Sequence, residues 1–290
     1  MSRCVLFLTL AIALFVPIVA HAVPESLGRG EQVASGVRRW TTKITRADGS
    51  TTLWIYLPDP LPADKLPCVF VAPAGSPLVV GNDLGEGAEP EHIPYAQAGM
   101  AVVAYSISGG VPDNPDNRTF EEGARVYMKN HAGLTDSKAA IDYAVANLKE
   151  IDSARLYTAG HSSAGTLALL TAEFDPRIAA CLSYAGVPDI IAFQSRDGIN
   201  ALDEQIDGFR AFLQRASPIT NVAKLKCPIF LFHADDDSVV NTAAIDVFYD
   251  ALRKTNDNVT YIKVPSGDHY QSMIDEGIPK GIAWLKGLNK

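Results

Sequence analysis

The sequence predicts an α/β fold built on a mostly parallel sheet, and three observations point to it. Continuous apolar runs recur along the chain without polar alternation, which is typical of strands buried on both faces. Segments whose apolar residues have helical spacing separate several of these runs. Strands that alternate with helices form right-handed βαβ units, so helices are expected on both faces of the sheet.

Eight segments are predicted to be strands. Residues 37–44 and 51–57 are rich in β-branched and aromatic residues, and Asp48 and Gly49 between them predict a β-hairpin. The other six are the apolar runs at 68–72, 101–105, 156–159, 178–182, 229–232 and 260–264. We therefore expect a mostly parallel eight-stranded sheet.

The segments between the strands predict helices. Residues 141–148 and 244–252 place their apolar side chains on one helical face, and Pro279 suits the first turn of a C-terminal helix. Residues 190–216 are longer than a single crossover needs. Their apolar residues predict a small helical insertion, either a cap over the site or a peripheral helix.

The first 22 residues have the features of a secretory signal peptide. An early arginine precedes an apolar run at 4–16, and an A-x-A cleavage site ends at Ala22. The run is too short for a comfortable membrane span. Residues 23–290 are therefore expected to form one α/β domain that is secreted or periplasmic, without stable membrane insertion.

Composition disfavours several classes of function. The net charge of −8 and the lack of a basic stripe disfavour nucleic acid and anionic membranes as partners. Cys68, Cys181 and Cys227 lie in or beside apolar runs, so they form no disulfide framework, although one bridge among them is left open. The sequence has no H-E-x-x-H, C-x-x-C or phosphate-binding glycine loop, so neither a metal nor an organic cofactor is expected.

A serine-containing turn follows the strand at 156–159. It reads Gly160-His161-Ser162-Ser163-Ala164-Gly165 and leads into an apolar helix. A strand, tight turn and helix in this order lift a serine Oγ above the sheet, and the helix N-terminus favours developing negative charge. Counted from Gly160 the nucleophile is Ser162, and counted back from Gly165 it is Ser163. Ser162 is preferred, because histidine is too bulky for the first position of the turn.

An acid and a base follow later strands, at the strand ends where open α/β sheets bind ligands. Asp235, Asp236 and Asp237 come after the run at 229–232, and His269 comes after the run at 260–264. Neutral His269 would take the serine proton, and an ionised aspartate would orient its imidazole. These positions alone leave open which of the three aspartates serves.

With its residues in the order Ser, Asp, His, the chain resembles the α/β hydrolases of the prolyl-oligopeptidase and dienelactone-hydrolase-like branch. Members carry H-G-x-x-D-x-x-V at the acid, and His233, Asp237 and Val240 fit this spacing. Ala234 replaces the glycine. The resemblance implies an α/β-hydrolase fold over nearly all of residues 23–290, with Asp237 as the triad acid and Asp236 as the second choice.

An oxyanion hole requires two donors aimed at the tetrahedral intermediate. One is expected to be the backbone N–H of Ser163, the residue after the nucleophile. The resemblance places the other in the loop after 68–72, where relatives often carry H-G-G. That loop here reads Pro73, Ala74, Gly75, and proline has no N–H, so Gly75 or Ala74 is the expected donor.

These residues predict a serine hydrolase and leave three functions to weigh. A carboxylesterase acting on a small or carbohydrate-borne ester is favoured, because a single domain with a small cap leaves the site open. A peptidase of the prolyl-oligopeptidase type is second, since the propeller that such enzymes usually carry has no room in this sequence. The third is a non-catalytic binding protein on a hydrolase scaffold. Dienelactone hydrolases proper use a cysteine nucleophile, and Ser162 argues against that chemistry. The sequence does not indicate the oligomeric state.

Overall fold

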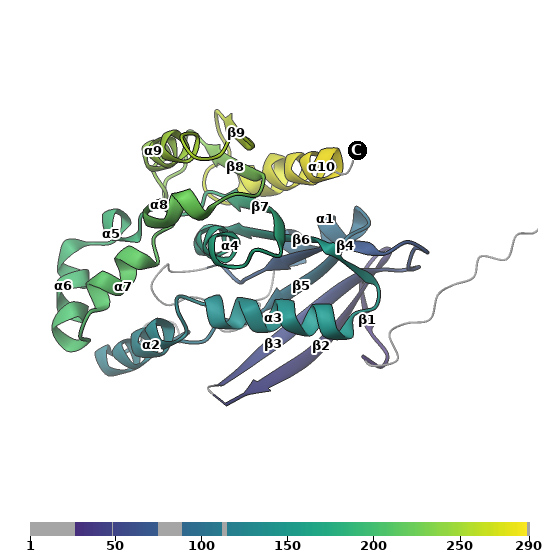
Figure 1. Cartoon of the computed structure of the whole chain (residues 1–290), viewed down its shortest axis with the longest axis horizontal. Coiled ribbons are helices and arrows are strands. Elements are labelled where there is room, and N and C mark those ends of the chain that lie inside the picture. Colours follow the sequence, from purple (N-terminus) through teal and green to yellow (C-terminus); the bar gives the residue numbers. More distant parts are fainter. Residues whose placement is uncertain (1–26, 48, 75–88, 112–114, 289–290) are drawn as a thin grey trace, which may run out of the picture.

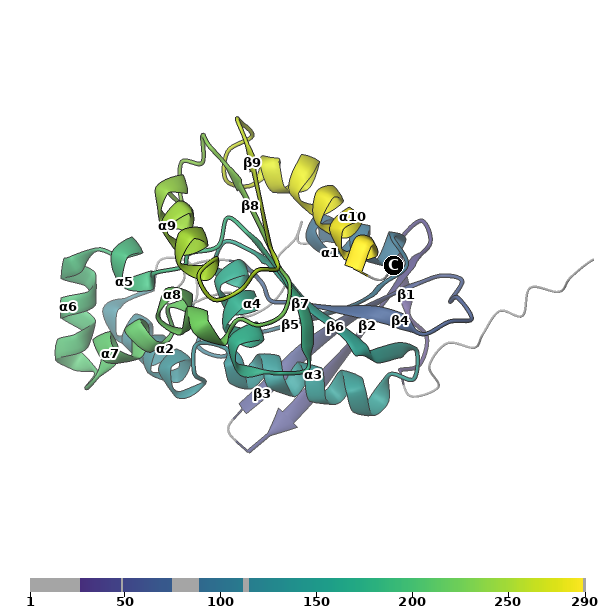
Figure 2. The same cartoon turned by 45° about the horizontal axis from the view of Figure 1, so that its top comes forward.

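The computed structural model describes residues 27–47, 49–74, 89–111 and 115–288. In these ranges a twisted sheet lies between helices, as Figure 1 and Figure 2 show. The expected signal peptide at 1–22 and the expected oxyanion donor Gly75 lie outside the described residues.

The described residues form one nine-stranded sheet in the order β1-β2-β3-β5-β4-β6-β7-β8-β9. The strands are β1 (Glu31–Ala34), β2 (Val37–Arg46), β3 (Gly49–Pro58), β4 (Leu66–Val71), β5 (Ala101–Tyr105), β6 (Ile151–His161), β7 (Ile178–Tyr184), β8 (Ile229–Ala234) and β9 (Val259–Val264). β1, β2, β3 and β5 pair antiparallel in turn, and every neighbouring pair from β5 to β9 is parallel. The eight predicted strands are present, and the short edge strand β1 makes the count nine rather than eight.

Helices cover both faces of the sheet. On one face lie α3 (Leu134–Asn147), α4 (Ser163–Phe174) and α9 (Thr242–Leu252), and on the other lie α1 (Glu89–Gln97) and α10 (Ile278–Leu288). Side chains alternate across each strand, so Phe70 of β4 packs under α3 and α4 while Val69 and Val71 pack under α1 and α10. A π-helical turn (Met273–Gly277) leads into α10.

Three short helices follow β7 where the sequence predicts a helical insertion. They are α5 (Ile190–Phe193), α6 (Arg196–Gln205) and α7 (Phe209–Arg215). They pack against α2 (Asn117–Lys129), because the Phe212 ring meets the Tyr127 ring edge-on, and Arg125 donates to the carbonyl of Gln205. Figure 1 shows α2 and this insertion together at one end of the molecule. α8 (Pro218–Asn221) and a 3-10 turn (Val222–Lys224) then return the chain to β8.

The three cysteines of the domain are free thiols. Cys68 and Cys181 are fully buried, and burial raises the pKa of the half-buried Cys227 thiol to about 11. A thiol with so high a pKa is a weak nucleophile, so these residues pack the core. Across the ranges that the structure describes, no helix is long and apolar enough to cross a membrane.

Glu173 of α4 is a buried acid whose carboxyl group has no hydrogen-bond partner among the described residues. Its side chain is 7% exposed. Burial raises the pKa of Glu173 to about 9, against a smaller opposing effect of Lys224. The folded chain therefore keeps this proton at pH values where the unfolded chain has lost it. Stability is expected to fall as pH rises between the two pKa values, because the unfolded state binds fewer protons there.

Replacing Glu173 with glutamine, which has the same shape and no charge, is expected to stabilise the protein by roughly 1–3 kcal/mol at pH 8 and by almost nothing at pH 4. Urea denaturation of both proteins at the two pH values measures the difference. The exposed Glu204→Gln serves as the control and should show no such pH dependence. A Glu173→Gln effect of equal size at both pH values would exclude ionisation as its cause.

Candidate active site

Ser162 stands at the apex of the tight turn between β6 and α4. Its backbone has φ 55° and ψ −125°, which is a strained conformation for a residue with a side chain. The flanking glycines permit the turn. A Cβ at Gly160 would lie 2.3 Å from the carbonyl carbon of Ala164, and a Cβ at Gly165 would lie 2.8 Å from the carbonyl oxygen of Gly160.

The structure separates the two candidate serines. Ser163 is the first residue of α4 and is 4% exposed, whereas Ser162 is partly exposed. The Ser162 N–H donates to the carbonyl of Tyr184 at 2.9 Å, and its carbonyl accepts from the N–H of Thr166 at 3.1 Å. Its side chain makes no capping bond to the helix. The backbone of Ser162 is therefore fixed, while the residue stays partly exposed.

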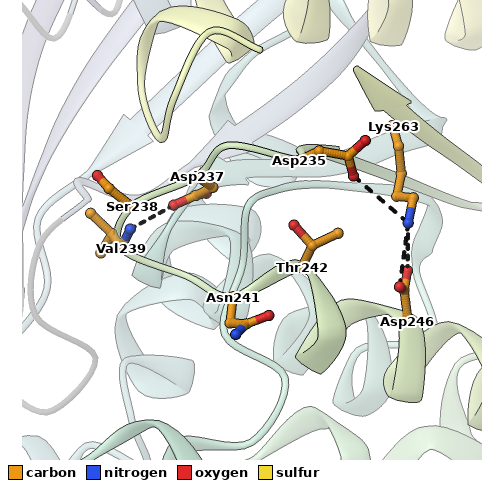
Figure 3. A pocket seen from close by; sticks show the side chains of 8 residues that line it. All are labelled: Asp235, Asp237, Ser238, Val239, Asn241, Thr242, Asp246 and Lys263. Atoms are coloured by element: carbon orange, nitrogen blue, oxygen red, sulfur yellow. Dashed lines mark hydrogen bonds and ion pairs between the residues drawn. The ribbon is translucent and has the colours of Figure 1, made fainter. Parts of the chain in front are cut away.

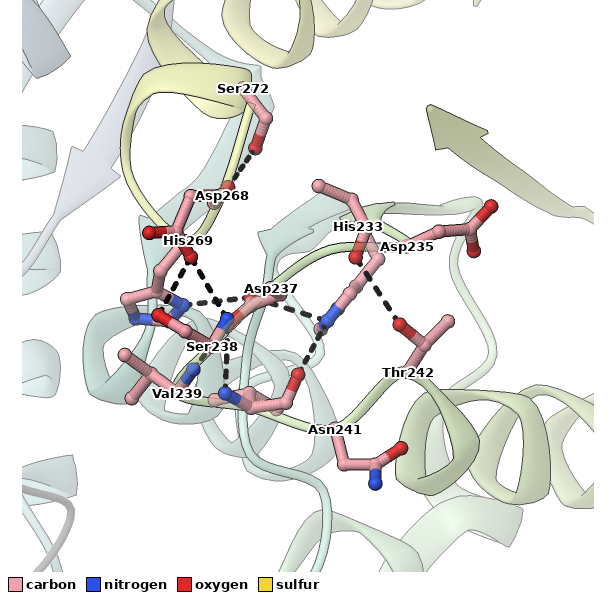
Figure 4. Close-up of polar contacts among 12 residues, drawn as sticks. His233, Asp235, Asp237, Ser238, Val239, Asn241, Thr242, Asp268, His269 and Ser272 are labelled. Atoms are coloured by element: carbon pink, nitrogen blue, oxygen red, sulfur yellow. Dashed lines mark hydrogen bonds and ion pairs between the residues drawn. The ribbon is translucent and has the colours of Figure 1, made fainter. Parts of the chain in front are cut away.

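Asp237 and His269 are hydrogen-bonded to each other. His269 Nδ1 lies 2.8 Å from Asp237 Oδ2, and the Asp237 carboxylate is fully buried (Figure 4). Oδ1 accepts the backbone N–H groups of Val239 and Val240, each at 2.8 Å, and His233 Nε2 lies 3.2 Å from Oδ2. Burial opposes ionisation, but the hydrogen bonds outweigh it and hold the pKa of Asp237 well below its ordinary value. A charged acceptor at Nδ1 keeps the proton there and leaves Nε2 of His269 as a base.

Asp236, the second choice for the acid, binds the neighbouring loop instead of the imidazole. It accepts the backbone N–H of Gly267 at 3.2 Å and that of Asp268 at 2.8 Å. Asp268 Oδ1 in turn accepts the N–H and the hydroxyl of Ser238, both at 2.8 Å, as Figure 4 shows. These four hydrogen bonds tie the aspartate loop to the histidine loop and fix their relative position.

His161 ties the histidine loop to the nucleophile turn. Its Nε2–H donates to the carbonyl oxygen of His269 at 2.9 Å, and the two ring centroids are 4.5 Å apart. Burial and the neighbouring His269 lower the pKa of His161 to about 4, so the ring is neutral near pH 7. The edge-on ring of Tyr270 packs against it. The hydrogen bond from His161 to His269 joins residues 108 positions apart in the chain, so the local sequence gives no sign of it.

Replacing His161 with leucine is expected to lower kcat about three- to tenfold, the effect of losing one neutral hydrogen bond. His161→Gln should restore most of the activity, because its side-chain amide can donate to the same carbonyl. Steady-state kinetics of both variants, with melting curves to check folding, measure the effect. If glutamine and leucine were equally impaired, the hydrogen bond would not be what positions His269.

Of the expected oxyanion donors, the structure describes Ser163 and Ala74. Ser163 lies directly after Ser162 at the start of α4. Ala74 follows β4, whose neighbour in the sheet is β6, so it leaves the sheet beside the serine turn. The N–H of Ser163 and the second donor, Ala74 or Gly75, stay predictions from the sequence.

A polar hollow of about 410 Å³ opens beside the aspartate loop (Figure 3). Its lining residues are Asp235, Asp237, Ser238, Val239, Asn241, Thr242, Asp246 and Lys263. Lys263 Nζ lies 3.3 Å from Asp246 and 3.8 Å from Asp235, so one cation is shared between two carboxylates. Within the described part of the chain, no three His, Cys, Asp or Glu side chains come together as ligands for a metal ion.

Comparison with known proteins gives a family and a set of relatives. Residues 90–286 match the prolyl oligopeptidase family. Acetyl esterase Axe7A from Xylanibacter ruminicola is 21% identical in a 264-residue alignment that covers 83% of this chain and 57% of the esterase. The chain thus spans little more than half of that curated relative.

Solved structures share the fold. The Pyrococcus horikoshii acylaminoacyl peptidase superposes with a TM-score of 0.68 at 16% identity, over 88% of this chain and 41% of its own. A puromycin-hydrolyzing peptidase from Mycobacterium tuberculosis superposes with a TM-score of 0.67 at 20% identity, over 89% of this chain and 40% of the peptidase. A Klebsiella pneumoniae structure assigned to the dienelactone hydrolases superposes with a TM-score of 0.61 at 18% identity, over 87% of this chain and 97% of its own. The predicted α/β-hydrolase fold is confirmed.

Proposed function

Because the chain belongs to the prolyl oligopeptidase family, we propose that it is a serine hydrolase that cleaves a carboxylic ester through an acyl-enzyme intermediate. The observation that carries the proposal is the 2.8 Å hydrogen bond from His269 to the buried Asp237, beside the strained turn of Ser162. A raised serine, a histidine with an unprotonated Nε2 and an ionised aspartate supply the nucleophile, the base and the orienting acid.

The proposed reaction has two halves. Ser162 Oγ attacks the acyl carbon while His269 Nε2 takes the hydroxyl proton, and the histidine then gives that proton to the departing alcohol as the C–O bond breaks. A water molecule, deprotonated by the same nitrogen, then attacks the acyl-enzyme. The products are a carboxylic acid and Ser162 with its proton restored. Asp237 stays ionised and stabilises the imidazolium in both halves.

The oxyanion that forms in each half needs donors at its position. We assign the backbone N–H of Ser163 and that of Ala74 or Gly75 to this role. Ser163 begins α4, so the partial positive charge of the helix N-terminus adds to the stabilisation.

An ester is favoured over an amide by two observations. The acetyl esterase relative aligns over 83% of the chain. Val239 and Tyr270, next to the acid loop and the base, are 52% and 40% exposed, which indicates an open site that a polymer-borne ester can reach. The second candidate is a peptidase, because the peptidases named above share the fold.

A matched substrate panel separates the two candidates. We would assay p-nitrophenyl acetate, an acetylated oligosaccharide, and p-nitroanilides of single amino acids and dipeptides. Each kcat/KM is divided by the rate constant of the uncatalysed reaction, since esters are intrinsically more labile. A larger enhancement for the esters, absent in Ser162→Ala, is expected. A larger enhancement for the anilides would make the chain a peptidase.

We also propose that residues 1–22 direct export, so that the enzyme acts outside the cytoplasm. Mass spectrometry of the protein recovered from an exporting host should find Val23 as the first residue. An intact N-terminus in a cytoplasmic fraction would contradict the proposal.

A further inference from the structure

A second hollow, of about 500 Å³, lies at the C-terminal end of α4. Its large apolar lining residues are Met128, Leu134, Leu170, Phe174 and Phe212. A mostly apolar hollow of this volume is typical of small-molecule sites. Since an α-helix rises 1.5 Å per residue, the hollow lies roughly 15 Å along α4 from the serine turn. A molecule bound there would not occupy the active site.

The walls of the hollow come from separate parts of the fold. Leu170 and Phe174 lie one turn apart on α4, and Phe212 of α7 faces them at 5% exposure. Phe174 is 47% exposed, although it is among the largest apolar side chains of the chain. A ligand with an apolar body would remove that surface from water, which is the main driving force for binding here.

Two cations stand at the hollow, Lys138 of α3 and Arg215 in the last turn of α7. Arg215 makes no ion pair with any residue that the structure describes, and its backbone carbonyl accepts a hydrogen bond from Asn221. Lys138 pairs with Asp142 at 2.8 Å, but it is 67% exposed, and such surface pairs contribute little to stability. Asp142 also binds Arg177, so it keeps a partner when Lys138 turns away. In a chain with a net charge of −8, cations beside an apolar hollow favour an anionic ligand.

The turn between α2 and α3 forms one lip of the hollow. His131 and Ala132 have φ of 54° and 59°, and Gly133 follows with 88°. Residues other than glycine adopt this backbone only at an energetic cost, and such strain recurs at ligand clamps. The turn places the exposed His131 in the lining, where its ring offers a further donor.

We propose that this hollow binds an amphipathic carboxylate, a molecule with an apolar body and one terminal carboxylate. The apolar walls cover the body, and Lys138 and Arg215 bind the carboxylate by charge-assisted hydrogen bonds. The site is independent of the proposed hydrolase, because none of its lining residues belongs to the serine turn or to the acid and base loops.

The test uses octanoate as the probe, with isothermal titration calorimetry on the full chain. One octanoate is expected to bind per chain, and 1-octanol, which has the same body without the charge, should bind at least about tenfold more weakly. Lys138→Glu combined with Arg215→Glu should weaken octanoate binding at least about tenfold. The control pair, exposed Lys254→Glu and Arg196→Glu, makes the same change in net charge and should leave binding unaltered.

A second variant tests the location without touching charge. Met128 is partly buried against the core and lines the hollow, so Met128→Trp should fill the hollow and abolish octanoate binding, with a melting curve to check that the variant folds. Binding that survives this variant or the charge reversal, or equal binding of octanol and octanoate, would overturn the proposal. The proposal would also be overturned if the wild type bound no octanoate and formed a dimer that Met128→Trp dissociates. A second copy of the chain would then cover the hollow. Ester turnover is not measured, so failure of the proposed function would leave this result intact.

Discussion

Replacing Ser162 with alanine is expected to lower kcat for ester hydrolysis by about 10⁴-fold or more, since no acyl-enzyme can form. The fold should persist, because the Ser162 side chain makes no capping hydrogen bond and the turn is held by backbone contacts to Tyr184 and Thr166. Steady-state assays with p-nitrophenyl acetate, together with far-UV circular dichroism, check both parts of the expectation.

The neighbouring serine provides the matched control. Ser163→Ala keeps the backbone N–H that is assigned to the oxyanion hole, so its kcat should stay within about tenfold of the wild type. If Ser163→Ala were as inactive as Ser162→Ala is expected to be, or if Ser162→Ala kept its activity, the assignment of the nucleophile would be wrong.

Replacing Asp237 with asparagine is expected to lower kcat by about 10⁴-fold near neutral pH. The asparagine amide can donate to His269 Nδ1, which forces the proton to Nε2 and removes the base. The Asp237 carboxylate also accepts the backbone N–H groups of Val239 and Val240, and the amide oxygen can still accept them. The loss should therefore be chemical, with little change in the melting temperature.

Asp236→Asn is the control for that variant. Among the described residues, Asp236 accepts hydrogen bonds only from the backbone N–H groups of Gly267 and Asp268, and an asparagine oxygen can replace its carboxylate there. Its kcat should fall by less than about tenfold. A larger loss in Asp236→Asn than in Asp237→Asn would transfer the role of triad acid to Asp236. Because the pKa of Asp237 is depressed, this carboxylate stays ionised at mildly acidic pH. Loss of activity in acid should therefore follow protonation of another group.

Most of the fold could be predicted because buried parallel strands are uninterrupted apolar runs. The edge strand β1 (Glu31–Ala34) escaped prediction, since its four residues are exposed or partly exposed and carry no such run. The start of α2 also could not be predicted from the sequence. Residues 109–118 are rich in Gly, Pro, Asp and Asn and predict a loop, and it is in this run that Asp116 caps the helix by accepting from Thr119 N–H.

The candidate site could be predicted as far as local spacing determines it. The spacing leaves three aspartates open, and the resemblance to the H-G-x-x-D-x-x-V pattern selects Asp237, which the structure shows hydrogen-bonded to His269. The ties between loops could not be predicted. The hydrogen bonds of Asp236 and His161 to the histidine loop span 31 to 32 and 108 residues, so they depend on how separate strand ends meet.

The central claim is that Ser162 forms the covalent bond to the acyl group. Incubating the folded chain with a fluorophosphonate, followed by digestion and mass spectrometry of the modified peptide, tests it most directly. One phosphonylated residue, Ser162, is predicted, with no label on heat-denatured protein or on Ser162→Ala. A label on Ser163, or no label on the folded wild-type chain, would contradict the claim.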